Sequence, residues 1–302
     1  MSRLDKKGSL PRRGGSERLI VQSLPSRING LLLVGGLGRD WRRVVEGIEE
    51  IGPKYPWLNR VISLGLDRFV RRLAVLSAGN PVGRILDAGA GDGSLTVVIQ
   101  SLARGSRHFL VMLDPSERML RLSQRRVNSE NTDRVAGLLE HPPFAPRTID
   151  RTYMAFSLRD VYDLEEAVRS LASVMRDEGL LTVVDIAKPD DAAAAAIHHL
   201  YWRFVSPFLA ALAFTRYWRQ TCLIHTTYRL LPSESSLLSL LRRHFTPIIT
   251  RRLLLGGLHI LVMKRQLQGS TRRPRGGCEG GGCPTNTCRN RPQLRKSQSG
   301  KD

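Results

Sequence analysis

The residues best suited to chemistry lie in a glycine-rich turn within the sequence RILDAGAGDGSLTVVI. An apolar run before the turn predicts a buried strand, and the residues after it predict a helix. The turn itself contains Gly89, Gly91 and Gly93. Such turns commonly seat a pyrophosphate on the helix N-terminus. Here, however, Asp87 ends the strand and Asp92 lies in the turn, where carboxylates would repel a pyrophosphate.

A cationic cofactor fits this turn better than a phosphate does. S-adenosylmethionine carries an ammonium and a sulfonium group and no phosphate, so nearby acids favour its binding. Asp114 ends the next apolar run, about 20 residues beyond the last glycine, where a carboxylate can accept hydrogen bonds from both ribose hydroxyls. The pattern therefore predicts an S-adenosylmethionine site, with a dinucleotide site as the alternative.

The segments around this turn alternate between short apolar runs and amphipathic stretches. Strands are expected at 84–88, 108–114, 134–140, 149–156 and 180–187, and a helical lead is expected from Trp41 onward. Such alternation predicts a parallel sheet with helices on both faces. The last two strands, 247–254 and 257–264, meet at a Gly-Gly pair and predict a hairpin. The expected fold class is α/β: a mostly parallel seven-stranded sheet with an antiparallel C-terminal hairpin.

Most of the net charge of +20 lies at the two ends of the chain. We expect a basic, flexible arm at 1–40, a folded domain at 41–265 and a basic, disordered tail at 266–302. Basic ends attract anions, including nucleic acid and anionic lipid, but they are also typical of solvated segments. The tail cysteines are one ligand short of a closed zinc site, so no metal site is expected. These cysteines are Cys278, Cys283 and Cys288.

Apolar segments bear on where the protein acts. The chain opens without an apolar stretch of signal-peptide length, and its Arg- and Ser-rich start leaves organellar targeting open. The longest uncharged apolar run, 204–215, is shorter than the about 20 residues that cross a bilayer. We expect a cytoplasmic protein with peripheral membrane contact. The aromatic segment 197–219 has arginines near its ends and suits an amphipathic lid at a membrane surface, although a core helix broken at Pro207 explains the same pattern.

Three stretches resemble the C-methyltransferases of menaquinone and ubiquinone biosynthesis, a branch of the class I methyltransferases. They are KYPWLNRVISLGLDR (54–68), AFSLRDVYDLEEAVRSLASVMRDEGLLTVVDIAKP (155–189) and LLLGGLHILVMKR (253–265). The resemblance implies the Rossmann-like class I methyltransferase fold, S-adenosylmethionine as cofactor, and methyl transfer to a ring carbon of a prenylated quinol precursor. The chain departs from the family pattern at Pro56, at Asp160 and at the pair Leu138-Leu139.

Site residues follow from the turn and from this resemblance. The cofactor-binding residues are expected to be Asp87, Gly89, Gly91, Asp92, Gly93, Asp114, Glu140 and Ala155. Glu140 is included because Leu138 and Leu139 replace the family's small polar pair near the adenine. Arg159 is expected to stabilise a phenolate and Asp160 to act as general base, unless the pair only caps its loop.

A substrate pocket is expected beside the helical lead. Tyr55, Asn59 and Ser63 fall four residues apart, which places them on one face of a helix, where they can line a pocket for the quinol head. Helix packing is the alternative for Tyr55 and Ser63.

The expected partner is a lipophilic quinol, and homodimer formation is left open. Other functions compatible with the sequence are methylation of another small molecule, RNA or protein, and a non-catalytic scaffold subunit that retains the methyltransferase fold. The residues AFSLRD stand where an amine-methylating motif would follow the fourth strand, so nucleic acid is not an expected partner.

Overall fold

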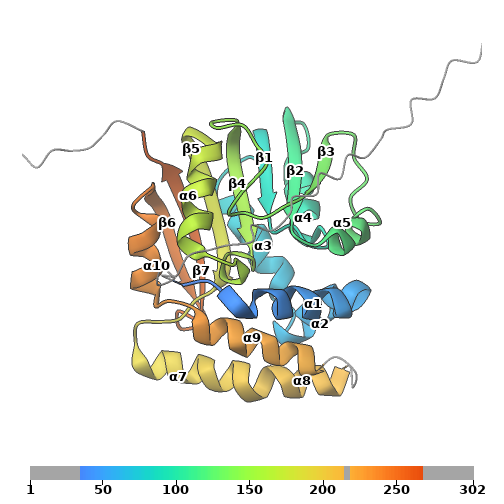
Figure 1. Cartoon of the computed structure of the whole chain (residues 1–302), viewed down its shortest axis with the longest axis vertical. Coiled ribbons are helices and arrows are strands. Elements are labelled where there is room, and N and C mark those ends of the chain that lie inside the picture. Colours follow the sequence, from blue (N-terminus) through green and yellow to red (C-terminus); the bar gives the residue numbers. More distant parts are fainter. Residues whose placement is uncertain (1–34, 214–217, 268–302) are drawn as a thin grey trace, which may run out of the picture. The chain divides into compact units, whose positions relative to one another are not determined.

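The computed structural model describes residues 35–213 and 218–267, and its centre is one seven-stranded sheet (Figure 1). The strand order is β3-β2-β1-β4-β5-β7-β6. Strands β1 to β5 pair in parallel, and β7 runs antiparallel to both β5 and β6. The expected mostly parallel sheet with a closing hairpin is confirmed. The strands are β1 Gly83–Ala88, β2 His108–Asp114, β3 Thr132–Ala136, β4 Ile149–Ala155, β5 Met175–Ile186, β6 Phe245–Leu253 and β7 Leu258–Arg265.

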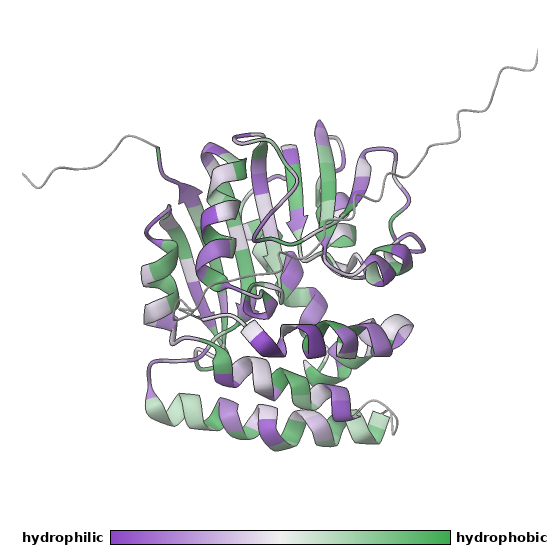
Figure 2. Cartoon of the chain, in the orientation of Figure 1, coloured by the Kyte–Doolittle hydropathy of each residue, from purple (hydrophilic) through white to green (hydrophobic). Residues whose placement is uncertain are grey.

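Helices cover both faces of this sheet because side chains alternate along each strand. In β1, Leu86 packs in one core cluster with α6 and α10, whereas Ile85 packs in another with α3 and α4. Figure 2 shows the apolar strands between these helices. The helices are α1 Trp41–Ile51, α2 Tyr55–Ile62, α3 Asp67–Ser77, α4 Ser94–Leu102, α5 Glu117–Ser123, α6 Leu164–Val174, α7 Ala192–Leu200, α8 Ser206–Ala213, α9 Trp218–Leu230 and α10 Glu234–Leu241.

A separate group of helices lies beyond the carboxyl ends of the parallel strands. Figure 1 shows α1, α2 and α9 next to these ends, with α7 and α8 outermost. Ligands in open α/β sheets bind at the carboxyl ends of the strands. This helical layer therefore covers the edge at which a site is expected. No helix in the described ranges is long and apolar enough to cross a membrane.

Several expected boundaries differ from the structure. The third strand ends at Ala136 instead of 140: the Gly137 N–H donates to the carbonyl of Asp114, the last residue of β2, at 3.1 Å, and β2 provides no further strand residue to pair with. Strand β5 begins at Met175 instead of 180, with a register shift opposite β4 and a left-handed Glu178 (φ 65°).

The edges of the folded domain also extend beyond 41–265. Leu37 is buried, and its N–H donates to the Val161 carbonyl at 2.8 Å. The Gln266 N–H donates to the His244 carbonyl at 3.0 Å. Most of the expected arm and tail, including the tail cysteines, lies outside the described residues.

The aromatic segment is a surface element up to residue 205, whereas α8 buries Ser206, Pro207 and Ala210. Pro207 is the second residue of α8, and a π-helical turn at Tyr201–Val205 joins α7 to α8 without a break in the helical path. No residue of α7 or of this turn is buried. The core-helix interpretation is therefore wrong for this part of the segment.

Candidate active site

The glycine turn between β1 and α4 has a backbone that side chains would block. Gly89 has φ +74°, and a Cβ atom there would lie 2.3 Å from the Cβ of Ser157. Gly91 has φ +52°, and a Cβ atom there would have a carboxylate oxygen of Asp114, at 4.0 Å, as its nearest neighbour. The third glycine, Gly93, caps α4 in the left-handed conformation. Glycine is needed at these positions, and the backbone at Gly91 stays open to a ligand.

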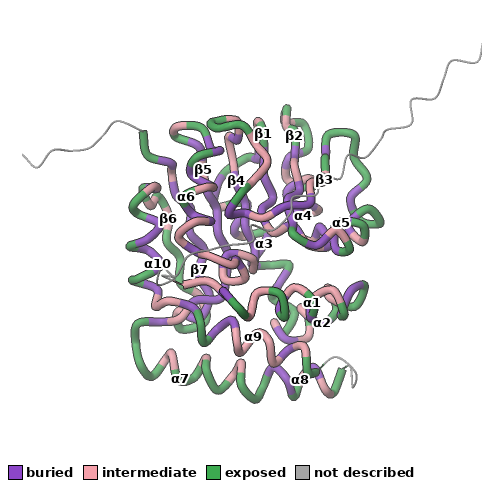
Figure 3. The backbone as a smooth tube through the Cα atoms, viewed as in Figure 1, coloured by how far each residue is buried: buried purple, intermediate pink, exposed green. Residues whose placement is uncertain are grey.

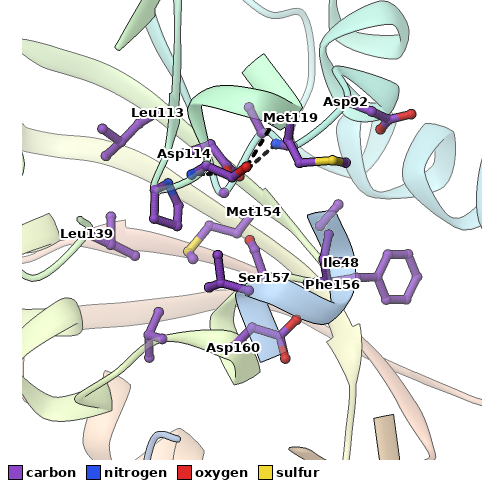
Figure 4. Close-up of a pocket in the computed structure, with 18 of the residues that line it drawn as sticks. Ile48, Asp92, Leu113, Asp114, Met119, Leu139, Met154, Phe156, Ser157 and Asp160 are labelled. Carbon is purple, nitrogen blue, oxygen red and sulfur yellow. Dashed lines mark hydrogen bonds between the residues drawn. The ribbon is translucent and has the colours of Figure 1, made fainter. Parts of the chain in front are cut away.

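Asp87 and Asp92 were expected to favour a cationic cofactor, but in the structure both bind other groups of the protein. The Asp87 carboxylate accepts a hydrogen bond from the Thr96 hydroxyl and is absent from the cavity wall, and burial raises its pKa to about 7. Asp92 does line the cavity, but it forms an ion pair with Arg126 at 2.7 Å. Figure 4 shows the Asp92 carboxylate turned away from Asp114. These two acids support the turn more than they attract a cation.

A cavity of about 950 Å³, counted with its open mouth, lies over the turn (Figure 4). Its apolar wall comes from α1 and from the ends of β2 and β4. Residues of that wall include Trp41, Val44, Ile48, Leu113, Met154 and Phe156. Phe156 directly follows β4 and has φ 61°, a rare conformation for an aromatic residue. Such strain is typical of functional sites.

Asp114 is a rigid carboxylate at the end of β2. Its Oδ2 accepts from the Gly91 N–H at 2.8 Å and its Oδ1 from the Ser116 N–H at 2.9 Å, as the dashed lines in Figure 4 mark. Burial raises its pKa to about 6, and the two backbone hydrogen bonds oppose that rise. The carboxylate is therefore mostly ionised at neutral pH and retains lone pairs for a ligand's hydroxyl groups.

Glu140 and Ala155 also line this cavity, as expected for cofactor-binding residues. One oxygen of Glu140 is committed to the fold, since Oε1 accepts from the backbone N–H groups of Tyr162 at 2.7 Å and Asp163 at 3.0 Å. The Ala155 carbonyl accepts from Arg71 at 3.4 Å. Their contact with a cofactor stays a prediction.

Arg71 is a site residue that the sequence reasoning missed. It lies on α3, lines the cavity and is only 5% exposed. Its guanidinium stacks over the Phe156 ring at 4.8 Å, its Nε has no hydrogen-bond partner, and no carboxylate of the described residues pairs with it. A buried cation with no carboxylate in direct contact is costly, so this wall offers a binding partner to an anionic group. The only signal was an arginine on the helix face that also carries Val70 and Ala74.

A second cavity of about 440 Å³ adjoins the first. Helices α1, α2 and α9 form most of its wall, and Tyr55 and Asp160 line both cavities. Asn59 lines the second cavity only. Ser63 lines neither, because α2 ends at Ile62 and the Ser63 hydroxyl accepts from the Asp67 N–H at 3.2 Å. The expected pocket role of Ser63 is therefore wrong.

Arg159 and Asp160 belong to a buried charge network. Arg159 lines the second cavity, pairs through Nη1 with Asp185 on β5, and holds its Nε 3.4 Å from Asp160 Oδ1. The Arg159 N–H also donates to Asp185 at 3.2 Å. Burial raises the pKa of Asp160 to about 7 against the opposing effect of Arg159. Burial likewise raises the pKa of Tyr55. Sequence reasoning missed Asp185 because it lies in an apolar strand far along the chain.

Comparison with solved structures identifies the class of protein. The sheet with its antiparallel β7 matches a SAM-dependent methyltransferase from Aquifex aeolicus with a TM-score of 0.50 at 14% identity, over 74% of this chain and 98% of that chain. It also matches a geranyl diphosphate methyltransferase in complex with SAM, with a TM-score of 0.50 at 12% identity, over 71% and 91%. The fold is that of the class I S-adenosylmethionine-dependent methyltransferases.

Sequence comparison identifies the family within that class. The chain belongs to the ubiE/COQ5 methyltransferase family, whose model matches residues 39–246. It is 30% identical over 177 residues to the ubiquinone/menaquinone biosynthesis C-methyltransferase UbiE of Geotalea uraniireducens, covering 56% of this chain and 74% of that protein. The UbiE of Shewanella woodyi is 29% identical over 175 residues, with 56% and 69% covered. The protein is a methyltransferase that uses S-adenosylmethionine.

The residues of the first cavity fit this cofactor. Backbone at Gly91 can approach it closely, and Asp114 would hold the ribose hydroxyls. The guanidinium of Arg71 would hold the carboxylate of the methionine part, since its Nε has no hydrogen-bond partner and no described carboxylate forms an ion pair with it. Tyr55 and Asp160, shared by both cavities, mark where the cofactor cavity meets the second one.

Proposed function

We propose that this methyltransferase transfers a methyl group to a ring carbon of a lipophilic quinol precursor. The observation that carries the proposal is the second cavity, which adjoins the cofactor cavity at the ionisable side chains of Tyr55 and Asp160 and has both an apolar and a polar wall. Its apolar wall includes Val44, Ile48, Ile51, Leu58, Leu223 and Ile224. The printed names of the relatives, which specify C-methylation in quinone biosynthesis, support the same acceptor class.

The chain's own residues supply the acid–base chemistry. Asp160, with a pKa of about 7, is suited to take a proton from an acceptor hydroxyl at neutral pH, directly or through water. Arg159 keeps a positive charge beside it and so stabilises both the ionised Asp160 and the developing phenolate. Bound S-adenosylmethionine supplies an electrophilic methyl group. The acceptor carbon would form the new C–C bond as the methyl–sulfur bond of the sulfonium breaks, with S-adenosylhomocysteine as the leaving group. Loss of the ring proton to water would then restore aromaticity.

Tyr55 positions the acceptor in this scheme. Its side chain lines both cavities, and its hydroxyl would donate a hydrogen bond to a ring oxygen. Helix α1 lines both cavities and α9 lines the second, so these helices would exclude water from the reactants and strengthen these interactions. The enzyme therefore contributes mainly position and electrostatics.

The test uses the full chain with isotopically labelled S-adenosylmethionine and a panel of demethylated benzoquinols and naphthoquinols with tails of different length. We expect label on a ring carbon, located by mass spectrometry. Tyr55→Phe should lower kcat about tenfold or more. Tyr201→Phe is the control, because that hydroxyl donates to the Ile62 carbonyl at 2.7 Å and lines neither cavity.

Two outcomes would contradict the proposal. Label on an oxygen or nitrogen atom would indicate a different acceptor chemistry. Cofactor binding without turnover on any quinol would favour the scaffold function instead.

A further inference from the structure

The outermost helices carry an unusually apolar surface. Ile197, Leu200, Phe204, Val205, Phe208 and Leu212 are exposed by 42% to 71%, and we call this set the outer apolar face. Most of them recur every three or four residues along the path from α7 through the π-helical turn to α8, which places them on one side of it. Figure 3 shows these helices largely exposed at the edge away from the sheet. Contiguous apolar surface of this kind marks a binding surface.

The chain segment that carries this face has basic side chains and no acidic ones. Residues 192–233 contain no Asp or Glu. Arg203, Arg219 and Arg229 are exposed in the same stretch. The Arg203 guanidinium lies 5.5 Å from the Phe204 ring centre, and that of Arg219 lies 5.6 Å from the ring of exposed Trp218. Cations next to exposed aromatic side chains suit the boundary between lipid head groups and acyl chains.

The inner side of the same layer leads to the second cavity. Ala210 of α8 is fully buried in a core cluster with Ile51, Leu58 and Ile62, which come from α1 and α2. Helix α9 packs against α8 and contributes Thr221 and other residues to the second cavity. The outer apolar face is therefore separated from the proposed acceptor site by this helical layer alone.

We propose that the outer apolar face binds the surface of an anionic lipid bilayer. Its apolar side chains would enter the acyl boundary, and its arginines would contact negatively charged head groups. A second copy of the chain is a poorer partner, because two faces that both lack acids repel each other. This inference rests on the proposed function, because a lipid surface is where a lipophilic acceptor would be found. The two can be tested separately, since vesicle binding is measured without a methyl acceptor.

Vesicle flotation with the full chain tests the apolar part of the proposal. We expect binding to vesicles of phosphatidylcholine with phosphatidylglycerol, and weaker binding to phosphatidylcholine alone. The double variant Phe204→Gln/Phe208→Gln should lower the partition coefficient about tenfold or more, because both side chains lose their transfer into lipid. Phe109→Gln/Ile248→Gln is the matched control, since these apolar side chains are exposed on β2 and β6, away from the face. It should bind as the unchanged chain does.

A second pair of variants tests the charges. Arg203→Gln/Arg219→Gln should weaken binding to anionic vesicles several-fold and leave the weak binding to neutral vesicles unchanged. Arg104→Gln/Arg107→Gln, exposed before β2, is the control for a general loss of positive charge. Circular dichroism checks that each variant is folded.

Three results would overturn the proposal. One is the absence of binding to either vesicle. Another is unchanged binding of Phe204→Gln/Phe208→Gln, which would assign binding to the basic ends of the chain. The third is a stable dimer in sedimentation experiments that this variant dissociates, because the face would then join two copies.

Discussion

Replacing Arg71 by methionine is the sharpest test of the cofactor site. Methionine keeps the unbranched, flexible shape that packs over Phe156 and removes only the charged donor. In the free protein the guanidinium has one long hydrogen bond, to the Ala155 carbonyl at 3.4 Å, and no ion pair with a described residue. The unfolding free energy of the free protein should therefore change by no more than ~1 kcal/mol, because the substitution removes only this one long hydrogen bond.

The cost should instead appear on binding. A hydrogen bond between a buried charged donor and a carboxylate contributes ~1.5–3 kcal/mol, which corresponds to about 10-fold to 150-fold in Kd. We expect Arg71→Met to raise the Kd for S-adenosylmethionine within that range. Decarboxylated S-adenosylmethionine lacks the group that Arg71 would bind, so its Kd should change little.

Isothermal titration calorimetry with both ligands provides the measurement. Arg72→Met is the control variant, because Arg72 is the exposed neighbour on the same helix and does not line the cavity. An equal loss for both ligands would show that the substitution only distorts the cavity. Unchanged affinity for S-adenosylmethionine would remove Arg71 from the site.

Further predictions concern the acid–base group, the ribose contact and the acceptor pocket. The value of kcat/KM should rise with pH through about 7 as Asp160 loses its proton, and Asp160→Asn should abolish that limb in a pH–rate profile. Asp114→Ala should raise the cofactor Kd about 10-fold to 100-fold by calorimetry, because it removes the ribose acceptor and the brace on Gly91. Asn59→Ala should raise KM for the quinol, because Asn59 lines the second cavity. Ser63→Ala should leave kcat and KM unchanged. It should lower the free energy of unfolding by ~1 kcal/mol in thermal unfolding, because the hydrogen bond from the Asp67 N–H is lost. The opposite result for these last two variants would restore Ser63 to the pocket.

The sequence was most informative where the signal is local. The alternation of apolar runs with amphipathic segments predicts the parallel strands, and the Gly256-Gly257 pair predicts the closing hairpin. Both signals are local, because periodicity and turn chemistry depend on neighbouring residues. The strand predicted to reach Glu140 ends at Ala136. Leu138 and Leu139 resemble a strand in composition, but Leu139 is buried in a loop, whose course depends on the hydrogen bonds of Glu140 to distant backbone.

The sequence by itself determined the sheet, the glycine turn and the carboxylate of Asp114, since each follows from residues close together in the chain. Only the tertiary structure decided which charges face the ligand. It placed Asp87 beneath the turn, neutralised Asp92 with Arg126, and left Arg71 unpaired in the cavity wall. The reason is that the net charge of a site depends on partners from distant segments, which only the packing of helices against strands brings within a few ångströms.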